Sequence, residues 1–296
     1  MAETSRKDLD LEEVSEKRAP EEVSRVYERI REVLRANVVN YVWRVFATKP
    51  KFLEAAWDQL EPAVDRGFLE AAEGIRALAI ERVWEGQTVP DHRTLLDGDL
   101  NDAVQRLRVF LEVNPRLLIL TSAMRLSWQQ GEIGGARQPA PAERGVPAHH
   151  PEIETKDSAT GDLKKVYKEL EEVLDLPSPN TDYRMLGVWP DYFTSAWNDL
   201  KTFIGSDSWK SEVVTVEWVA KQAAVALPAK ITISPRWAKE IGLQTEEVDE
   251  VGTWIEAFDG LLPGLIVNTS YLWVGLHGGR TALQGEGHPL FEKAAS

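Results

Sequence analysis

Asp182 carries an acidic side chain on a face that its neighbours mark as inward. The helix predicted after Pro179 has an apolar stripe formed by Met185, Leu186 and Trp189. Asp182 lies three residues before the first of these and four before the second, so it lies on the same face. Burial disfavours the charged form of a carboxyl group and raises its pKa, which suits a general base acting on water.

Asn114 has a comparable position in an earlier segment. It precedes an apolar stripe formed by Leu117, Leu118 and Thr121. An asparagine amide offers N–H donors and a carbonyl acceptor, with which it could hold a water molecule or a substrate. Asp182 and Asn114 are therefore the candidate catalytic residues.

Helix capping is the alternative explanation for both residues. Thr181 or Asp182 could cap the helix that runs to Val188, and Asn114 followed by Pro115 has the order of an N-cap and a first helical residue.

An internal repeat helps to weigh the two explanations. Residues 26–60 align with 166–200 at an offset of 140, and eleven of these 35 positions are identical, where chance gives roughly two or three. Residues 115–122 align with 263–270 at an offset of 148. The same order of segments in both halves indicates a duplication.

The two candidates break this repeat. Asp182 aligns with Val42, and Asn114 aligns with Leu262. At each of these two inward positions one half has a polar side chain where the other half has an aliphatic one, with Asp182 in the second half and Asn114 in the first. Two such differences favour a functional role over capping.

Helical periodicity fits the aligned segments better than strand alternation does. Apolar residues recur at i, i+4, i+7 and i+8 from Val26 and again from Val166. Pro50, Pro115 and Pro190 each precede a periodic run and are predicted in the first turn of a helix. A strand-like pattern occurs only at 225–234, where Pro228 weakens it.

The predicted fold class is all-α, with two pseudo-symmetric helical repeats packed as an intramolecular pseudo-dimer. The first repeat covers 20–128 and the second 161–277. A long linker rich in Gly and Pro, 129–160, joins them, and 278–296 is predicted to be a C-terminal tail.

Composition excludes several function classes. The chain has 296 residues and no Cys, which removes disulfides, thiolate metal sites and cysteine nucleophiles. Its net charge of -14 disfavours nucleic acid and anionic membrane surfaces as partners. The first 18 residues lack an apolar signal segment and the apolar stretch near 260–267 is short, so we expect a cytoplasmic protein.

The histidines offer little support for a metal centre. The sequence contains His92, His149, His150, His277 and His288. All five lie in or next to loop-like sequence without an i, i+4 partner, so we expect solvated surface residues, no bound metal and no cofactor. The signatures of nucleophilic serine hydrolases, P-loop proteins and zinc peptidases are also absent.

Three strings resemble those of the group I 2-haloacid dehalogenases, the DehI family. They are RVFATKP at 44–50, NPRLLIL at 114–120 and TDYRMLGVWP at 181–190. The resemblance covers nearly the whole chain and implies an all-α pseudo-dimer with its active site between the repeats. It also implies hydrolysis of both enantiomers of 2-haloacids by an activated water, with inversion at C2 and no ester intermediate. Asp182 matches the family's catalytic base, and Asn114 matches its water-positioning residue.

The resemblance further places four residues in the substrate pocket, namely Val38, Tyr41, Thr181 and Phe258. Three of them depart from the family pattern, since Val38 replaces a Trp, Tyr41 a Phe and Phe258 a Tyr. The added phenol of Tyr41 could bind a carboxylate. The repeat unit is also similar to the AhpD-like helical fold, whose redox chemistry needs a Cys pair that this chain lacks.

The sequence therefore predicts a cofactor-independent dehalogenase whose partner is a small halogenated carboxylic acid, with a homodimer as the candidate assembly. Asp182 would deprotonate water, Asn114 would orient it, and Arg or Tyr side chains would hold the substrate carboxylate. The alternative is a non-catalytic or differently specific paralogue that binds a small carboxylic acid between the repeats. Retention of Asp182 and Asn114 favours the enzyme, and the change at Val38 favours the alternative.

Overall fold

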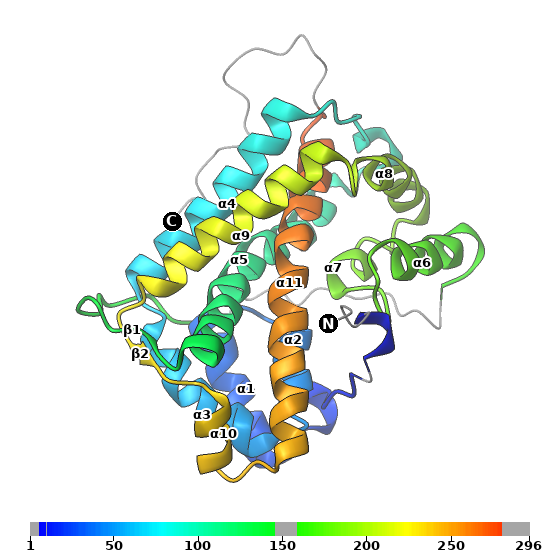
Figure 1. Ribbon diagram of the computed structural model, residues 1–296. Helices are drawn as coiled ribbons and strands as arrows, with labels where there is room; N and C mark the ends of the chain where they lie inside the picture. Colours follow the sequence, from blue (N-terminus) through cyan, green and yellow to red (C-terminus); the bar gives the residue numbers. More distant parts are fainter. Residues whose placement is uncertain (1–5, 10, 146–158, 280–296) are drawn as a thin grey trace.

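The computed structural model describes residues 6–9, 11–145 and 159–279, and these form an almost entirely helical protein (Figure 1). The helices are α1 (Glu21–Leu34), α2 (Tyr41–Phe46), α3 (Pro50–Leu60), α4 (Arg66–Gly86), α5 (Leu100–Gln130), α6 (Gly161–Val173), α7 (Thr181–Arg184), α8 (Pro190–Phe203), α9 (Asp207–Val225), α10 (Pro235–Glu240) and α11 (Thr245–Leu276). The predicted all-α class is confirmed. Residues 280–296 of the predicted tail and 146–158 of the predicted linker lie outside the described residues.

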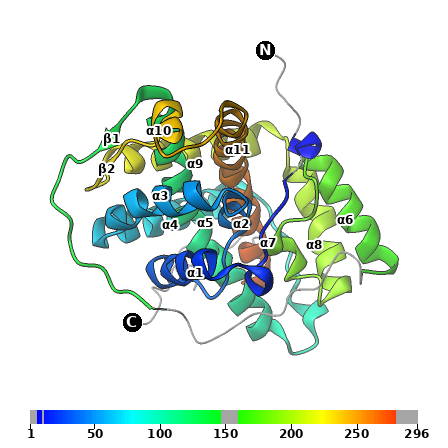
Figure 2. The ribbon, with the colours of Figure 1, turned by 90° about the horizontal axis from the view of Figure 1, so that it is seen from below.

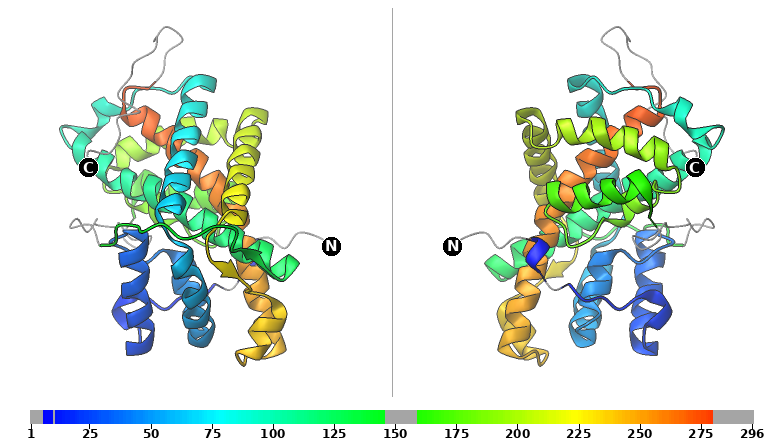
Figure 3. Two further views of the ribbon diagram at one scale, coloured as in Figure 1. Left: turned by 90° about the vertical axis from the view of Figure 1, so that its left-hand side faces the viewer. Right: turned by 90° about the vertical axis from the view of Figure 1, so that its right-hand side faces the viewer.

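The long helices α4, α5, α9 and α11 pack against one another and form the centre of the molecule (Figures 1 and 3). The contact between α5 and α11 is the most extensive of any pair. Both helices contain long runs of buried residues, because each is surrounded by other helices over much of its length. Their central position allows α5 and α11 to supply side chains to a site inside the molecule.

Shorter helices flank this centre on two sides. In one group α1 packs on α3 and α2 joins them, while in the other α6 packs on α8 beside α7 (Figure 2). α1 is strongly amphipathic and buries Val26, Ile30 and Val33, as its periodicity predicts. α3 and α8 begin with Pro50 and Pro190 in the first turn, again as predicted.

The prediction for Pro115 was wrong. Pro115 lies inside α5, and Pro263 occupies the matching place inside α11. A proline within a helix removes one backbone hydrogen bond. Each helix nevertheless continues, since buried residues on both sides of the proline keep it packed in the core.

The backbone repeats itself at the predicted offset of 140. Arg35 and Asp175, just after α1 and α6, are both left-handed, with φ of 51° and 52°. Asn40 and Asn180, which precede α2 and α7, have φ of -61° with ψ of 153° and 154°. These matching bends agree with a duplicated unit and give α2 and α7 equivalent starting points; the repeat boundaries and the pseudo-dimer stay predictions.

Two short strands lie within the described residues. β1 (Ile133–Gly134) pairs antiparallel with β2 (Lys230–Ile231), and Ile133 is opposite Ile231. β2 falls in the segment with the strand-like pattern. β1 belongs to the predicted linker, so part of that linker packs against the second half. Among the described residues, no helix is both long enough and apolar enough to cross a membrane.

Candidate active site

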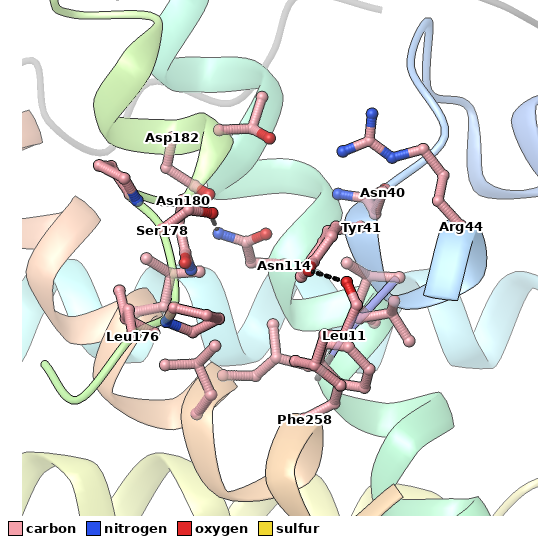
Figure 4. Close-up of a pocket in the computed structure, with 18 of the residues that line it drawn as sticks. Leu11, Asn40, Tyr41, Arg44, Asn114, Leu176, Ser178, Asn180, Asp182 and Phe258 are labelled. Atoms are coloured by element: carbon pink, nitrogen blue, oxygen red, sulfur yellow. Dashed lines mark hydrogen bonds between the residues drawn. The ribbon is translucent and has the colours of Figure 1, made fainter. Parts of the chain in front are cut away.

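A cavity of about 210 Å³ lies between the starts of α2 and α7 (Figure 4). Its wall is formed by the segment before α1, by residues 40–44, by the middle of α5, by residues 176–184 and by α11. Pockets for drug-sized ligands measure roughly 300–1,000 Å³, so this cavity suits a smaller molecule.

Asp182 and Asn114 meet at this cavity. The Asn114 side-chain Nδ2 donates a hydrogen bond to Asp182 Oδ1 at 2.6 Å, although the residues come from α5 and α7 (Figure 4). Asp182 is 5% exposed and Asn114 is 1% exposed. Both side chains are therefore inward, as their stripes predict.

Capping does not explain the position of Asn114. It lies in the middle of the 31-residue helix α5, so it caps nothing. Asp182 is the second residue of α7, after Asn180 at the N-cap, and no side-chain capping bond is present there. The polar exchange at each position instead produces one buried acid–amide pair.

Burial raises the pKa of the Asp182 carboxyl from 3.8 to about 6, while the hydrogen bond from Asn114 acts in the opposite direction. An acid with this pKa is largely ionised near neutral pH, yet basic enough to accept a proton from water.

The other predicted pocket residues are only partly brought together. Tyr41, Thr181 and Phe258 line the cavity, and the rings of Tyr41 and Phe258 meet edge to face at 6.0 Å. Val38 is buried but is not on the cavity wall, since a valine lacks the reach of the tryptophan expected there. The Tyr41 hydroxyl donates its proton to the carbonyl of Leu11 at 2.8 Å. This carbonyl therefore competes with a substrate carboxylate for the hydrogen bond that the sequence predicts.

The charged residues of the wall favour an anionic ligand. Among the described lining residues, Arg6, Arg44 and Arg184 are basic, while Glu13 and Asp182 are acidic. Arg44 forms an ion pair with Glu13 at 3.2 Å and lies over the Tyr41 ring. The arginines outnumber the carboxylates, which makes the potential of the cavity attractive to a small anion.

One protein family, described as halocarboxylic acid dehydrogenase DehI, matches residues 37–183. This stretch contains both Asn114 and Asp182. The chain belongs to the DehI family. The resemblance seen in the sequence is thereby confirmed.

Curated relatives of this DehI-family chain carry related names. An (R)-2-haloacid dehalogenase of Pseudomonas putida is 28% identical over 282 residues, covering 87% of this chain and 90% of the relative. A configuration-inverting 2-haloacid dehalogenase of Pseudomonas sp. (strain 113) is 26% identical over 190 residues, covering 59% and 61%.

Solved structures share the fold. The complex of a D-2-haloacid dehalogenase with L-LA has a TM-score of 0.85 and 24% identity, and the alignment covers 91% of this chain and 97% of that one. A mutant of a D-2-haloacid dehalogenase with D-2-CPA gives the same values. At this level of identity the likeness establishes the fold.

Cavity residues of the DehI-family chain occur in matching pairs. Offsets of 140 and 148 relate Asn40 to Asn180, Tyr41 to Thr181, Val42 to Asp182, Arg44 to Arg184, Phe110 to Phe258, Asn114 to Leu262 and Leu117 to Leu265. The cavity thus lies where equivalent parts of the two halves approach each other. The acid–amide pair has no equivalent at the aligned positions, so the two sides of the cavity differ chemically.

Among the wall residues that sequence reasoning missed are Arg6, Leu11 and Glu13. They precede the first repeat and belong to no periodic pattern, so no local signal marked them. Phe110 was also missed, although its alignment with Phe258 could have revealed it.

A buried polar chain supports α7. Trp209 Nε1 donates to Asn268 Oδ1 at 2.8 Å, and Asn268 Nδ2 donates to the hydroxyl of Tyr183 at 3.0 Å. Tyr183 is the neighbour of Asp182. Asn268 aligns with Leu120. The repeat alignment therefore contained a third position at which one half has a polar residue and the other an apolar one.

The expectation for the histidines was wrong for His92. Its side chain is 5% exposed, and Nε2 lies 2.8 Å from Asp199 Oδ2, because the η4 turn (Arg93–Leu96) packs against α8. His149, His150 and His288 lie outside the described residues. Within the described ranges, no group of three or more potential metal-binding side chains is present.

Proposed function

We propose that this protein is a hydrolytic dehalogenase that converts small 2-haloalkanoic acids into 2-hydroxy acids with inversion at C2. The observation that carries the proposal is the buried pair of Asp182 and Asn114 on the wall of a small, positively lined cavity. The names of the curated relatives support the reaction class and its inversion.

In the proposed reaction Asp182 takes a proton from a water molecule held beside it. The water oxygen attacks C2 from the side opposite the halogen, a C–O bond forms, and the C–halogen bond breaks with its electron pair leaving as halide. The proton stays on Asp182 until it is released to solvent. A single displacement of this kind inverts C2.

Asn114 can form hydrogen bonds with both the base, Asp182, and the attacking water. Its amide has two N–H donors and a carbonyl acceptor, and one N–H is used on Asp182. The remaining groups can bind the water, so the same side chain fixes the base and orients the nucleophile. No step of this scheme requires a cofactor.

Halide release tests the reaction. The purified protein is incubated separately with (R)- and (S)-2-chloropropionate, with Asp182→Asn as the control. We expect chloride from the wild-type protein and 2-hydroxy acid of the opposite configuration. The prediction that both enantiomers react stands only if each yields chloride, and release from neither would refute the dehalogenase.

A single turnover in ¹⁸O-water tests the role of Asp182. If Asp182 only deprotonates water, the first product molecule already contains the heavy oxygen and the enzyme stays unlabelled. If Asp182 attacked carbon, an ester would form and the label would enter the carboxylate first. Unlabelled product together with a labelled Asp182 peptide would rule out the direct attack of water.

A cytoplasmic location and a homodimer remain predictions from the sequence. Fractionation of the cells and the mass of the protein in solution would test them.

A further inference from the structure

The chain before α1 forms one wall of the cavity. Residues 6–9 and 11–18, here called the N-terminal strap, contribute Arg6, Leu11 and Glu13 to the lining. Figure 2 shows this dark-blue segment passing between α2 and the group of α6, α7 and α8. The strap is thus placed where a ligand between the halves would touch it.

Hydrogen bonds hold the strap to the first half. The Tyr41 hydroxyl donates to the Leu11 carbonyl at 2.8 Å, and the Val14 amide donates to the Arg44 carbonyl at 3.0 Å. Tyr27 donates its hydroxyl proton to the Val14 carbonyl at 2.7 Å. These bonds fix the backbone on both sides of Glu13.

The start of the strap is held to the second half. The Arg6 amide donates to Asp175 Oδ2 at 2.7 Å, and its Nη2 donates to the Leu174 carbonyl at 3.4 Å. The guanidinium also lies against α11, since a Cβ placed on Gly260 would be 3.9 Å from Nη1. The side chain is therefore fixed at the cavity between the loop before α7 and α11.

The bonds of Arg6 differ from those of Arg44, which also lines the cavity. Arg44 already has a carboxylate partner, Glu13. Among the described residues, the Arg6 guanidinium donates to one acceptor, the Leu174 carbonyl, and forms no ion pair with a carboxylate. Its buried Nε has no hydrogen-bond partner, as is also true of the Arg44 Nε, so the missing carboxylate is what distinguishes Arg6. A buried donor without an acceptor is unfavourable unless a ligand supplies one.

We propose that Arg6 binds the carboxylate of the substrate. The guanidinium supplies the positive charge and the parallel donors that a carboxylate accepts. The strap then has a defined function, because it places this positive charge at a cavity whose other basic residues, Arg44 and Arg184, come from the repeats. The identity of the ligand rests on the proposed function.

Kinetics and binding of Arg6→Gln and Arg6→Lys test this role. We expect Arg6→Gln to raise KM for 2-chloropropionate and the Kd for lactate by about 10–100-fold, as for the loss of a charged hydrogen bond. The kcat should change by less than threefold, because Arg6 takes no part in the proton transfer. Arg6→Lys keeps the charge and should lose less.

Lys7→Gln is the matched control, since it removes the same charge from the exposed neighbour of Arg6. It should leave KM and Kd unchanged. An Arg6→Gln variant that behaves like Lys7→Gln would overturn the proposal, and so would equal effects on kcat and KM. Lactate binding distinguishes the two proposals. If lactate binding depends on Arg6 but no halide is released, the proposed dehalogenase activity is refuted and the role of Arg6 in binding a carboxylate is not. If the wild-type protein binds no lactate, the role of Arg6 is refuted.

Discussion

Proton transfer needs the ionised form of Asp182, whereas burial in the folded protein favours the protonated form. We expect Asp182→Asn to lower kcat by about 10²–10⁴-fold, the range for loss of a general base. The asparagine oxygen can still accept the hydrogen bond from Asn114. A purified variant that keeps more than half of the wild-type activity would remove Asp182 from the mechanism.

The same variant should be more stable than the wild-type protein at pH 7. Burial raises the pKa of Asp182 from 3.8 to about 6, so the folded state disfavours its ionised form. A shift of this size corresponds to at most about 3 kcal/mol in the free energy of unfolding. Thermal unfolding at pH 7 measures the gain, and a lower melting temperature for Asp182→Asn would contradict this account.

The pH dependence follows from the direction of that shift. kcat/KM should rise about tenfold per pH unit below pH 6 and level off above pH 7, because the base must be ionised. The stabilisation from protonated Asp182 is complete below about pH 4 and is lost as the pH rises through 6. The stability difference between the wild-type protein and Asp182→Asn should therefore vanish toward pH 4; a difference independent of pH would contradict the raised pKa.

At the scale of the element, α7 has four residues and is too short to hold its own position. The hydrogen bond from Asn268 to Tyr183 ties it to α11, and Trp209 fixes Asn268 in turn. The geometry of Asp182 thus depends on a helix more than 80 residues away in the sequence.

Asn268→Leu tests this support, since leucine is the residue at the aligned position 120. It leaves the buried hydroxyl of Tyr183 without its donor, and the unfolding free energy should fall by about 1–3 kcal/mol. We expect kcat to fall at least tenfold with a smaller change in KM, because Asp182 moves relative to Asn114. Thr269→Val is the control, since the Thr269 hydroxyl donates to carbonyls of its own helix. Equal kcat values for the two variants would exclude a positioning role for Asn268.

At the scale of the whole molecule, the two halves offer equivalent places for an acid, and one of them carries it. Val42 is 4% exposed and lines the cavity at the position equivalent to Asp182. Leu262 stands where Asn114 stands in the other half. The two sides of the site therefore differ chemically because the two halves, which are otherwise similar there, carry different residues at these two positions.

Val42→Asp should destabilise the protein and create no second site. The new carboxylate would be buried without an amide partner, which we expect to reduce the unfolding free energy by about 2–3 kcal/mol. Combined with Asp182→Asn, it should not restore halide release. An unchanged melting temperature would mean that the acid reaches solvent at position 42, and restored activity would mean that Leu262 suffices in place of an amide.

The sequence by itself determined the helical class and singled out Asp182 and Asn114 as candidates. Periodicity near Val26 and the first-turn prolines at 50 and 190 act within a few residues of the chain, so they can be recognised locally. Asp182 and Asn114 were recognisable because the other half shows what a purely structural residue would be at each position.

Only the tertiary structure decided which distant groups complete the site. The Arg6 amide donates to Asp175, 169 residues away, and His92 Nε2 lies 2.8 Å from Asp199 Oδ2, 107 residues away. α5 continues through Pro115 because packing along its length compensates for one lost hydrogen bond. Contacts of this kind depend on the positions of whole helices, and no pattern within one segment encodes them.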